Sequence, residues 1–179
     1  MASRDAATVD LRALIRDVPD FPKPGILFRD VTPLLGNGPG FRACIQQLGG
    51  RLAPLRPQVI AGIESRGFIF GAAVAVELGL GFVPIRKPGK LPWRTRKEAY
   101  ALEYGTDAVE VHEDAVAPGT RVALVDDLLA TGGTASAAVK LLQGLGAEVV
   151  AAAFVIELAF LRGRERLGKL PASALITYE

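Results

Sequence analysis

The hydrophobic positions of this chain alternate between short continuous apolar runs and stretches with helical spacing. The continuous runs cover residues 59–63, 81–86, 121–125, 149–156 and 174–178. Runs of this length, rich in β-branched residues, are typical of strands buried on both faces of a parallel sheet. Pro84 lies in the second run and weakens that strand prediction, because proline removes one ladder donor.

Helical spacing predicts helices between these runs. Two sets of apolar positions mark helices, namely Leu11, Leu14, Ile15 and Val18, and Phe41, Cys44, Ile45, Leu48 and Leu52. A third helix is expected from about residue 68 to residue 78, where Gly79 ends it, and a fourth after a turn at 131–134. The alternation of strands and helices predicts an α/β fold, in which a twisted, mainly parallel sheet is flanked by helices.

Residues 87–112 depart from this alternation. The sequence KPGKLPWRTRKEA at 87–99 is basic and has almost no apolar periodicity, so it predicts a long exposed loop. After it, apolar and polar residues alternate over 100–104 and again over 109–112, on either side of 105–107. This alternation predicts a β-hairpin.

Composition and charge narrow the picture further. With 179 residues, 50% of them hydrophobic and 22% charged, the chain fits a single domain over 1–179. A net charge of +2 favours neither nucleic acid nor a membrane as a partner, and no segment is long enough to span a bilayer. The N-terminus lacks a secretory signal, and the single cysteine, Cys44, is expected to be a buried thiol. A cytoplasmic location is therefore expected.

The strongest chemical motif is RVALVDDLLATGGTASAAVKLL at residues 121–142. Its apolar run leads to Asp126 and Asp127, which are expected at the carboxyl end of a strand, where open α/β sheets bind ligands. The small residues that follow let backbone N–H groups converge on an anion at the start of a helix. The pattern predicts a ribose-phosphate cradle built from the two carboxylates and from Ala130, Thr131, Gly132, Gly133 and Thr134.

A second motif, ESRG at residues 64–67, follows the strand predicted at 59–63 in the same way. Ser65 can donate a hydroxyl, Arg66 can bind two phosphate oxygens, and Gly67 allows close backbone approach. Two anion-binding loops at one sheet edge suit a substrate with two phosphate groups. Ordinary solvated turns remain the alternative for both motifs, whereas a Walker P-loop is excluded because it requires a Gly-Lys pair that residues 130–134 lack.

Together these motifs resemble the type I phosphoribosyltransferases, in which a hydrophobic strand, two acids and a TGGT-type loop hold the ribose 5-phosphate of phosphoribosyl pyrophosphate (PRPP). The resemblance implies that family's fold, with a small hood from about residues 1–35 and a mobile lid hairpin over about 87–112. It also implies a cis peptide between Glu64 and Ser65. The segments FPKPGILFRD, ESRGF, RKPGKLP, LEYG and VALVDDLLATGGT are similar to those of the family members that act on adenine.

The resemblance implies transfer of the 5-phosphoribosyl group from PRPP to adenine, which gives AMP and pyrophosphate in purine salvage. Mg²⁺ is the implied cofactor, carried by substrate oxygens without a metal site made by protein alone. A homodimer is also implied. Two alternatives stay open: a phosphoribosyltransferase for another purine base, and a non-catalytic regulator that senses PRPP.

The resemblance also implies roles for individual residues. The backbone of Leu27 and Arg29 would read the edge of adenine and Phe28 would supply an apolar face, although core packing of Phe28 and pairing of Arg29 with Asp30 are plain alternatives. Glu103 is the implied acid/base, unless it is simply a surface carboxylate. Tyr104 and Arg66 are the other candidate catalytic residues. The residues expected to bind pyrophosphate are Ser65, Arg66, Arg86, Lys87 and Lys90.

Overall fold

The computed structural model describes residues 9–101 and 106–179. The chain divides into two compact units, Met1–Gln46 and Gln47–Glu179. The expected hood falls in the first unit and the expected lid in the second. A single domain over the whole chain stays a prediction.

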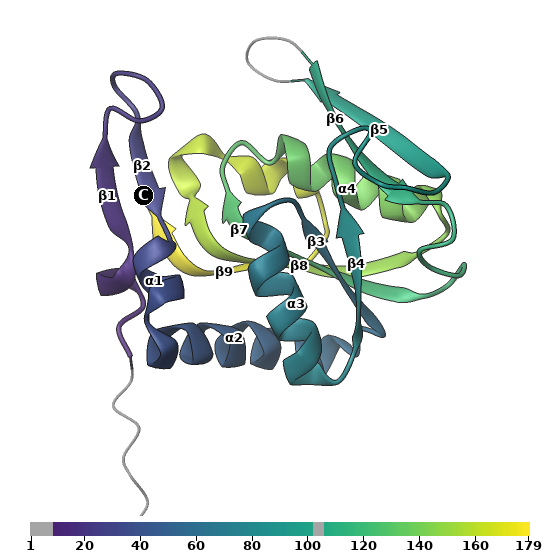
Figure 1. Ribbon diagram of the computed structural model, residues 1–179, viewed down its shortest axis with the longest axis horizontal. Coiled ribbons are helices and arrows are strands. Elements are labelled where there is room, and N and C mark those ends of the chain that lie inside the picture. The colour runs from purple at the N-terminus through teal and green to yellow at the C-terminus, as the bar shows by residue number, and fades with distance from the viewer. Residues whose placement is uncertain (1–8, 102–105) are drawn as a thin grey trace, which may run out of the picture. The chain divides into compact units, whose positions relative to one another are not determined.

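The first unit contains a short antiparallel hairpin (Figure 1). Strand β1 (Arg16–Pro19) pairs with β2 (Leu27–Asp30), and the unit also holds η1 (Arg12–Leu14), α1 (Thr32–Gly36) and the start of α2 (Gly38–Leu52). The helix predicted from Leu11 to Val18 is wrong, because only η1 is helical there. So short a helix is marginal by itself, whereas the hairpin gains a ladder and an ion pair of 2.7 Å between Arg16 and Asp30.

The second unit is built on a parallel sheet of five strands in the order β4-β3-β7-β8-β9. The strands are β3 (Val59–Ile63), β4 (Gly81–Ile85), β7 (Arg121–Leu129), β8 (Glu148–Leu158) and β9 (Ala172–Tyr178). All five predicted strands are therefore confirmed. Pro84 is tolerated because β4 lies at the edge of the sheet, where one ladder side needs no donor.

Two helices cover opposite sides of this sheet (Figure 1). They are α3 (Arg66–Leu78) and α4 (Gly133–Gly144), and short 3-10 turns, η2 (Ala53–Leu55), η3 (Ala159–Leu161) and η4 (Gly163–Leu167), join the remaining elements. Gly79 ends α3 with a φ of 68°, as its position predicted. Phe154 and Leu142 are fully buried between the sheet and α4, so the core fixes the strand ends on which the site depends.

The lid region forms a two-stranded antiparallel hairpin, β5 (Thr95–Ala101) and β6 (Thr106–His112). The hairpin was predicted, but the exposed loop expected over 87–99 is wrong from Thr95 onward, where β5 begins. Exposed basic residues mask this strand in the sequence. Among the hairpin residues whose side chains are described, the fully buried ones are Val109 and Val111 of β6. The turn at 102–105 lies outside the described residues.

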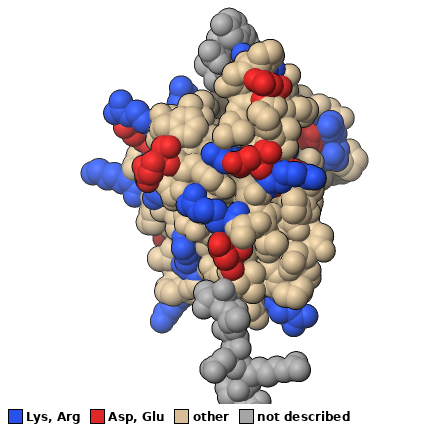
Figure 2. Space-filling model, turned by 90° about the vertical axis from the view of Figure 1, so that its left-hand side faces the viewer, with Lys and Arg blue, Asp and Glu red and all other residues tan. Residues whose placement is uncertain are grey.

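Charged side chains of both signs are interspersed on the face shown in Figure 2. This distribution fits the small net charge of +2. Over the described part of the chain, no helix is both long and apolar enough to cross a membrane. Charged groups that serve binding must therefore be gathered locally. Such a group of charged side chains lies at the carboxyl ends of β3 and β7.

Candidate functional site

The candidate site lies where β3 and β7 end side by side. The chain leaves β3 toward β4 and leaves β7 toward β8, on opposite sides, so the loops diverge and open a crevice. A cavity of about 380 Å³ occupies this position. The predicted site residues that line it are Ser65, Arg66, Lys87, Asp126, Asp127, Ala130, Thr131, Gly132, Gly133 and Thr134. The two anion loops inferred from the sequence thus meet in one cavity.

The phosphate loop, residues 130–134, leads from β7 into α4. Gly132 has a φ of 77°, a left-handed conformation that favours glycine, and its carbonyl accepts a hydrogen bond of 2.9 Å from the N–H of Ser136. The first N–H groups of α4 have no partner within the helix and open toward the cavity that Gly133 and Thr134 line. This arrangement suits a phosphate group.

The acid pair lies within β7, which ends four residues later than predicted. The strand was expected to stop at residue 125, but it continues to Leu129 because β8 is long enough to pair with it. Asp127 is only 7% exposed and forms an ion pair with Nε of Arg66. Arg66 therefore joins the two anion loops, rather than pointing freely into the cavity.

Asp126 sits in a tight, partly desolvated position. Its Oδ1 accepts a hydrogen bond of 2.9 Å from the N–H of Asp127 and lies against Gly67, where a Cβ would come closer than 3.0 Å. Burial, and then the neighbouring Asp127 carboxylate, raise the pKa of Asp126 well above its usual range. A ligand that donates hydrogen bonds or brings positive charge favours the ionised form of this carboxyl group.

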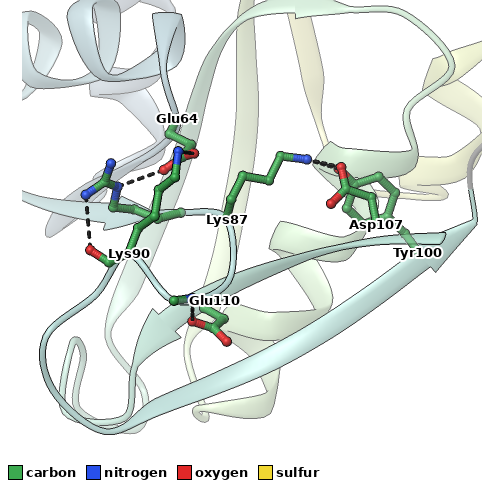
Figure 3. A network of polar contacts seen from close by, with 8 residues as sticks. Glu64, Lys87, Lys90, Tyr100, Asp107 and Glu110 are labelled. Carbon is green, nitrogen blue, oxygen red and sulfur yellow. Dashed lines mark hydrogen bonds and ion pairs between the residues drawn. The ribbon is translucent and has the colours of Figure 1, made fainter.

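Glu64 anchors the second loop. The Glu64–Ser65 peptide is cis, as the family resemblance implied. The Glu64 side chain is only 8% exposed and accepts hydrogen bonds of 2.7 Å from Nε of Arg86 and 2.9 Å from Nζ of Lys90 (Figure 3). Burial by itself raises the pKa of Glu64, but the hydrogen bonds from Lys90 and Arg86 outweigh it and lower that pKa below its usual value.

A second set of contacts ties residues 87–89 to the hairpin (Figure 3). Nζ of Lys87 forms an ion pair with Asp107 and a hydrogen bond of 3.1 Å with Oη of Tyr100. The N–H of Gly89 donates to Oε2 of Glu110 at 3.1 Å. All four cations predicted to bind pyrophosphate, Arg66, Arg86, Lys87 and Lys90, thus have a carboxylate partner in this structure. Of these four, Arg66 and Lys87 line the cavity.

The residues expected to read adenine lie on β2 in the first unit. Leu27 is 45% exposed, and the ring of Phe28 packs edge-on against Phe21 at 5.1 Å between centroids. Arg29 forms an ion pair with Asp17 across the hairpin, whereas Asp30 pairs with Arg16. In these two ion pairs, Arg29 and Asp30 each bind a residue of β1 across the hairpin.

Two candidate catalytic residues, Glu103 and Tyr104, lie outside the described residues. Within the described ranges, no group of three or more His, Cys, Asp and Glu side chains is placed to hold a metal ion. The cavity nevertheless offers carboxylate oxygens from Asp126 and Asp127, the hard donors that suit Mg²⁺ when a substrate supplies further oxygens.

Comparison with known proteins agrees with this geometry. Residues 40–170 match the model of the phosphoribosyl transferase domain. The adenine phosphoribosyltransferase of a Synechococcus strain is 56% identical over 171 residues, which cover 96% of this chain and 100% of that protein. The chain belongs to the adenine phosphoribosyltransferase family.

Solved structures of this family share the fold. The adenine phosphoribosyltransferase of Thermoanaerobacter pseudethanolicus superposes with a TM-score of 0.92 at 49% identity, covering 94% of this chain and 98% of that one. The Saccharomyces cerevisiae enzyme, crystallised with D-2,5-dideoxy-2,5-imino-altritol 1,6-bisphosphate and adenine, has a TM-score of 0.86 at 41% identity and covers 91% of this chain and 94% of that one.

Several residues that shape the site were not assigned a role from the sequence. Glu64 and Asp107 hold the cations of the lid region, and Gly163 and Glu157 lie behind the phosphate loop. A carboxylate directly after an apolar strand run is a usable signal for Glu157. The contact of Gly163 joins residues far apart in sequence, so the pattern along the chain holds no signal for it.

Proposed function

We propose that this chain transfers the 5-phosphoribosyl group of PRPP to adenine and releases AMP and pyrophosphate, a step of purine salvage. The observation that carries the proposal is the single cavity in which the acid pair and the phosphate loop face the Ser65–Arg66 turn. A ligand with a phosphate at one end, a diol in the middle and a diphosphate at the other end matches these three groups in order. The family membership supports adenine as the acceptor.

The phosphate loop and the acid pair bind the part of the substrate that does not change. Backbone N–H groups of 131–134 hold the 5-phosphate, and Asp126 and Asp127 accept hydrogen bonds from the ribose hydroxyls. Binding energy from this remote end orients the sugar for reaction. As the anomeric carbon loses its bond to pyrophosphate, positive charge builds on the ring, and the neighbouring carboxylates stabilise it.

The departing diphosphate binds at the other end. We assign it to Ser65, Arg66, Arg86, Lys87 and Lys90. In this assignment the diphosphate oxygens replace Glu64 and Asp107 as partners of the cations, so the lid closes as the substrate binds. Closure excludes water, which would otherwise hydrolyse the activated sugar.

Adenine supplies the nucleophile. N9 forms a bond to the anomeric carbon while the carbon–oxygen bond to pyrophosphate breaks, with inversion at that carbon. Glu103 accepts or stabilises the proton that the base loses, and Tyr104 donates its hydroxyl to pyrophosphate. Backbone groups of Leu27 and Arg29 recognise the edge of adenine, and Phe28 covers its face, so a 6-oxo purine would leave buried groups unpaired.

In this proposal the substrate carries Mg²⁺, which would neutralise part of the diphosphate charge. Asp126 and Asp127 are the carboxylates of the cavity lining that would hold such an ion. We also propose a cytoplasmic homodimer. Sedimentation at several concentrations tests the dimer, and a strictly monomeric active enzyme contradicts it.

Product formation tests the function directly. The purified chain is incubated with labelled adenine, PRPP and Mg²⁺, with hypoxanthine and guanine as competitors. AMP formation that neither competitor suppresses supports the proposal. Equal turnover of hypoxanthine would favour the alternative of another purine base, and PRPP binding without any turnover would favour a sensor.

Glu103→Gln probes the proton step within the same assay. The amide keeps the size of the side chain but cannot take up the proton of adenine, so turnover is expected to fall by about 10²-fold while binding of PRPP stays unchanged. Wild-type turnover in this variant would remove Glu103 from the mechanism.

A further inference from the structure

The phosphate loop rests directly on the backbone of η4. A Cβ built on Gly163 would approach the carbonyl oxygen of Ala130 far inside the 3.0 Å limit of real Cβ contacts and would lie 2.9 Å from the amide nitrogen of Gly132. A Cβ on Gly132 would meet the carbonyl of Gly163 in the same way. Two backbones thus touch where neither tolerates a side chain, and Gly163 is buried there.

An ion pair between half-exposed Arg164 and buried Glu157 holds η4 in this position. Glu157, at 6% exposure, binds Arg164 through both carboxylate oxygens, one of them at 2.9 Å from Nε. Nη1 of Arg164 also donates to the carbonyl of Ala172 on β9. In the sheet, Glu157 is the register partner of Leu129, the last residue of β7 before the phosphate loop.

The same segment is fixed at its other end. Leu167, the last residue of η4, is 8% exposed and packs in the core cluster that includes Ala135 and Leu142 of α4. The turn that carries Gly163 is therefore held on one side by the Glu157–Arg164 ion pair and on the other by the packing of Leu167 in the core. Its backbone is in direct contact with the phosphate loop.

We propose that Gly163 and the Glu157–Arg164 pair are positioning residues for the phosphate loop. They act through Ala130 and Gly132 and do not touch the substrate. The inference rests on the proposed function for its substrate, because it assigns to these residues the alignment of the 130–134 amides with the 5-phosphate of PRPP.

The variant Gly163→Ala tests this inference by adding one methyl group. The methyl group must displace the carbonyl of Ala130, and a misplacement on the order of 1 Å within a site lowers the rate by up to about 10²-fold. We expect KM for PRPP to rise by about 10- to 100-fold while KM for adenine stays within about twofold. Affinity for ribose 5-phosphate, measured by calorimetry, is expected to fall by the same factor.

Gly144→Ala is the matched control. Gly144 is the last residue of α4, has an ordinary φ and would have no atom within 4 Å of an added Cβ. Its kinetics and its ribose 5-phosphate affinity are expected to equal those of the wild type.

Arg164→Lys is the second variant. Lysine keeps a positive charge beside buried Glu157 but cannot bind both carboxylate oxygens as the guanidinium does. The variant is therefore expected to displace the phosphate loop less than Gly163→Ala does. We expect a several-fold rise in KM for PRPP with an unchanged KM for adenine.

The outcomes separate cleanly. Folded Gly163→Ala and Arg164→Lys proteins with wild-type KM for PRPP and wild-type ribose 5-phosphate affinity overturn the inference. Loss of cooperative unfolding in both variants also overturns it, because the segment would then serve folding alone. If only Gly163→Ala fails to fold, Arg164→Lys decides.

Failure of the proposed function is recognised in the wild type. A wild-type chain that forms no AMP refutes that function, and calorimetry with ribose 5-phosphate on the same proteins still tests the role of Gly163. A wild-type chain that binds no ribose 5-phosphate overturns the inference as well.

Discussion

Replacing Gly67 by alanine perturbs the acid pair without removing a functional group. Gly67 is buried at the start of α3, against the carboxylate of Asp126. An added Cβ would lie 3.2 Å from the carboxyl carbon of Asp126 and 3.3 Å from its Cα, and closer than 3.0 Å to Oδ1. Because the Cα belongs to strand β7 and cannot yield, the carboxylate or the helix must move.

The size of the loss in activity follows from how far Asp126 or α3 must move to restore an ordinary contact with the added Cβ. An ordinary contact with Oδ1 requires a shift on the order of 1 Å, and a misplacement of this size lowers rates by up to about 10²-fold. We expect kcat/KM for PRPP to fall by about 30- to 100-fold, equivalent to about 2 to 3 kcal/mol of transition-state stabilisation. If the helix moves instead, overpacking destabilises the fold by about 1 to 3 kcal/mol.

Steady-state kinetics with PRPP varied at saturating adenine, together with thermal unfolding, measure both effects. Gly50→Ala on α2 is the control, because a Cβ there meets open space. It should leave kcat/KM unchanged, and the stability of the fold should stay the same or rise slightly. A Gly67→Ala enzyme with wild-type kcat/KM and wild-type stability would refute the claim that the Asp126 carboxylate must stay in this place.

Three further predictions concern charge and burial. Asp127→Asn removes the ion-pair partner of Arg66 and a proposed ligand of the ribose, so kcat/KM for PRPP should fall by about 10- to 100-fold in the same kinetic assay. A wild-type value would exclude the proposed role of Asp127. Because the pKa of Asp126 is raised, ribose 5-phosphate affinity measured by calorimetry should weaken on acidification at a higher pH than an ordinary aspartate would allow. In Asp126→Asn only the pH dependence that comes from titration of the phosphate itself should remain. Because the pKa of Glu64 is lowered in the fold, its stabilising contribution is present above the ordinary pKa and is lost as the pH falls through the folded value. Chemical unfolding should therefore find wild type more stable than Glu64→Gln at neutral pH but not in acid, and an equal difference at both would contradict the ion pairs.

The sequence predicts the sheet well because its strands are buried on both faces. The predicted strand at 59–63 coincides with β3. The strands predicted at 149–156 and 174–178 correspond to β8 and β9, and they differ from them by no more than two residues at either end. The end of β7 was missed because Asp126 and Asp127 interrupt the apolar run while the ladder with β8 continues. The pattern of apolar residues indicates which part of a strand is buried. The end of the strand is set instead by the neighbouring strand with which it forms hydrogen bonds.

The misplaced elements have a common physical cause. Residues 11–18 have helical spacing, but pairing with β2 overrides a weak local preference. The start of β5 at Thr95 carries exposed basic residues and is a strand only because β6 lies beside it. Tertiary partners, absent from any local window of sequence, decide both cases.

The sequence predicted which residues line the cavity better than it predicted which side chains contact one another. The residues predicted for the two anion loops line one cavity, because their types and spacing carry the chemistry. Their role in binding an anion stays a prediction. The partners of Arg86 and Lys90 were not found, since Glu64 appears in the sequence as one more polar residue of a turn. The contact of Gly163 with the phosphate loop likewise depends on the folded chain alone.

A crystal structure of this chain with ribose 5-phosphate bound is the most direct measurement of the central claim. The account predicts that the phosphate accepts hydrogen bonds from the backbone N–H groups of 131–134 and that the ribose hydroxyls donate to Asp126 and Asp127. A sugar phosphate bound elsewhere, or these two carboxylates turned away from the diol, would contradict it.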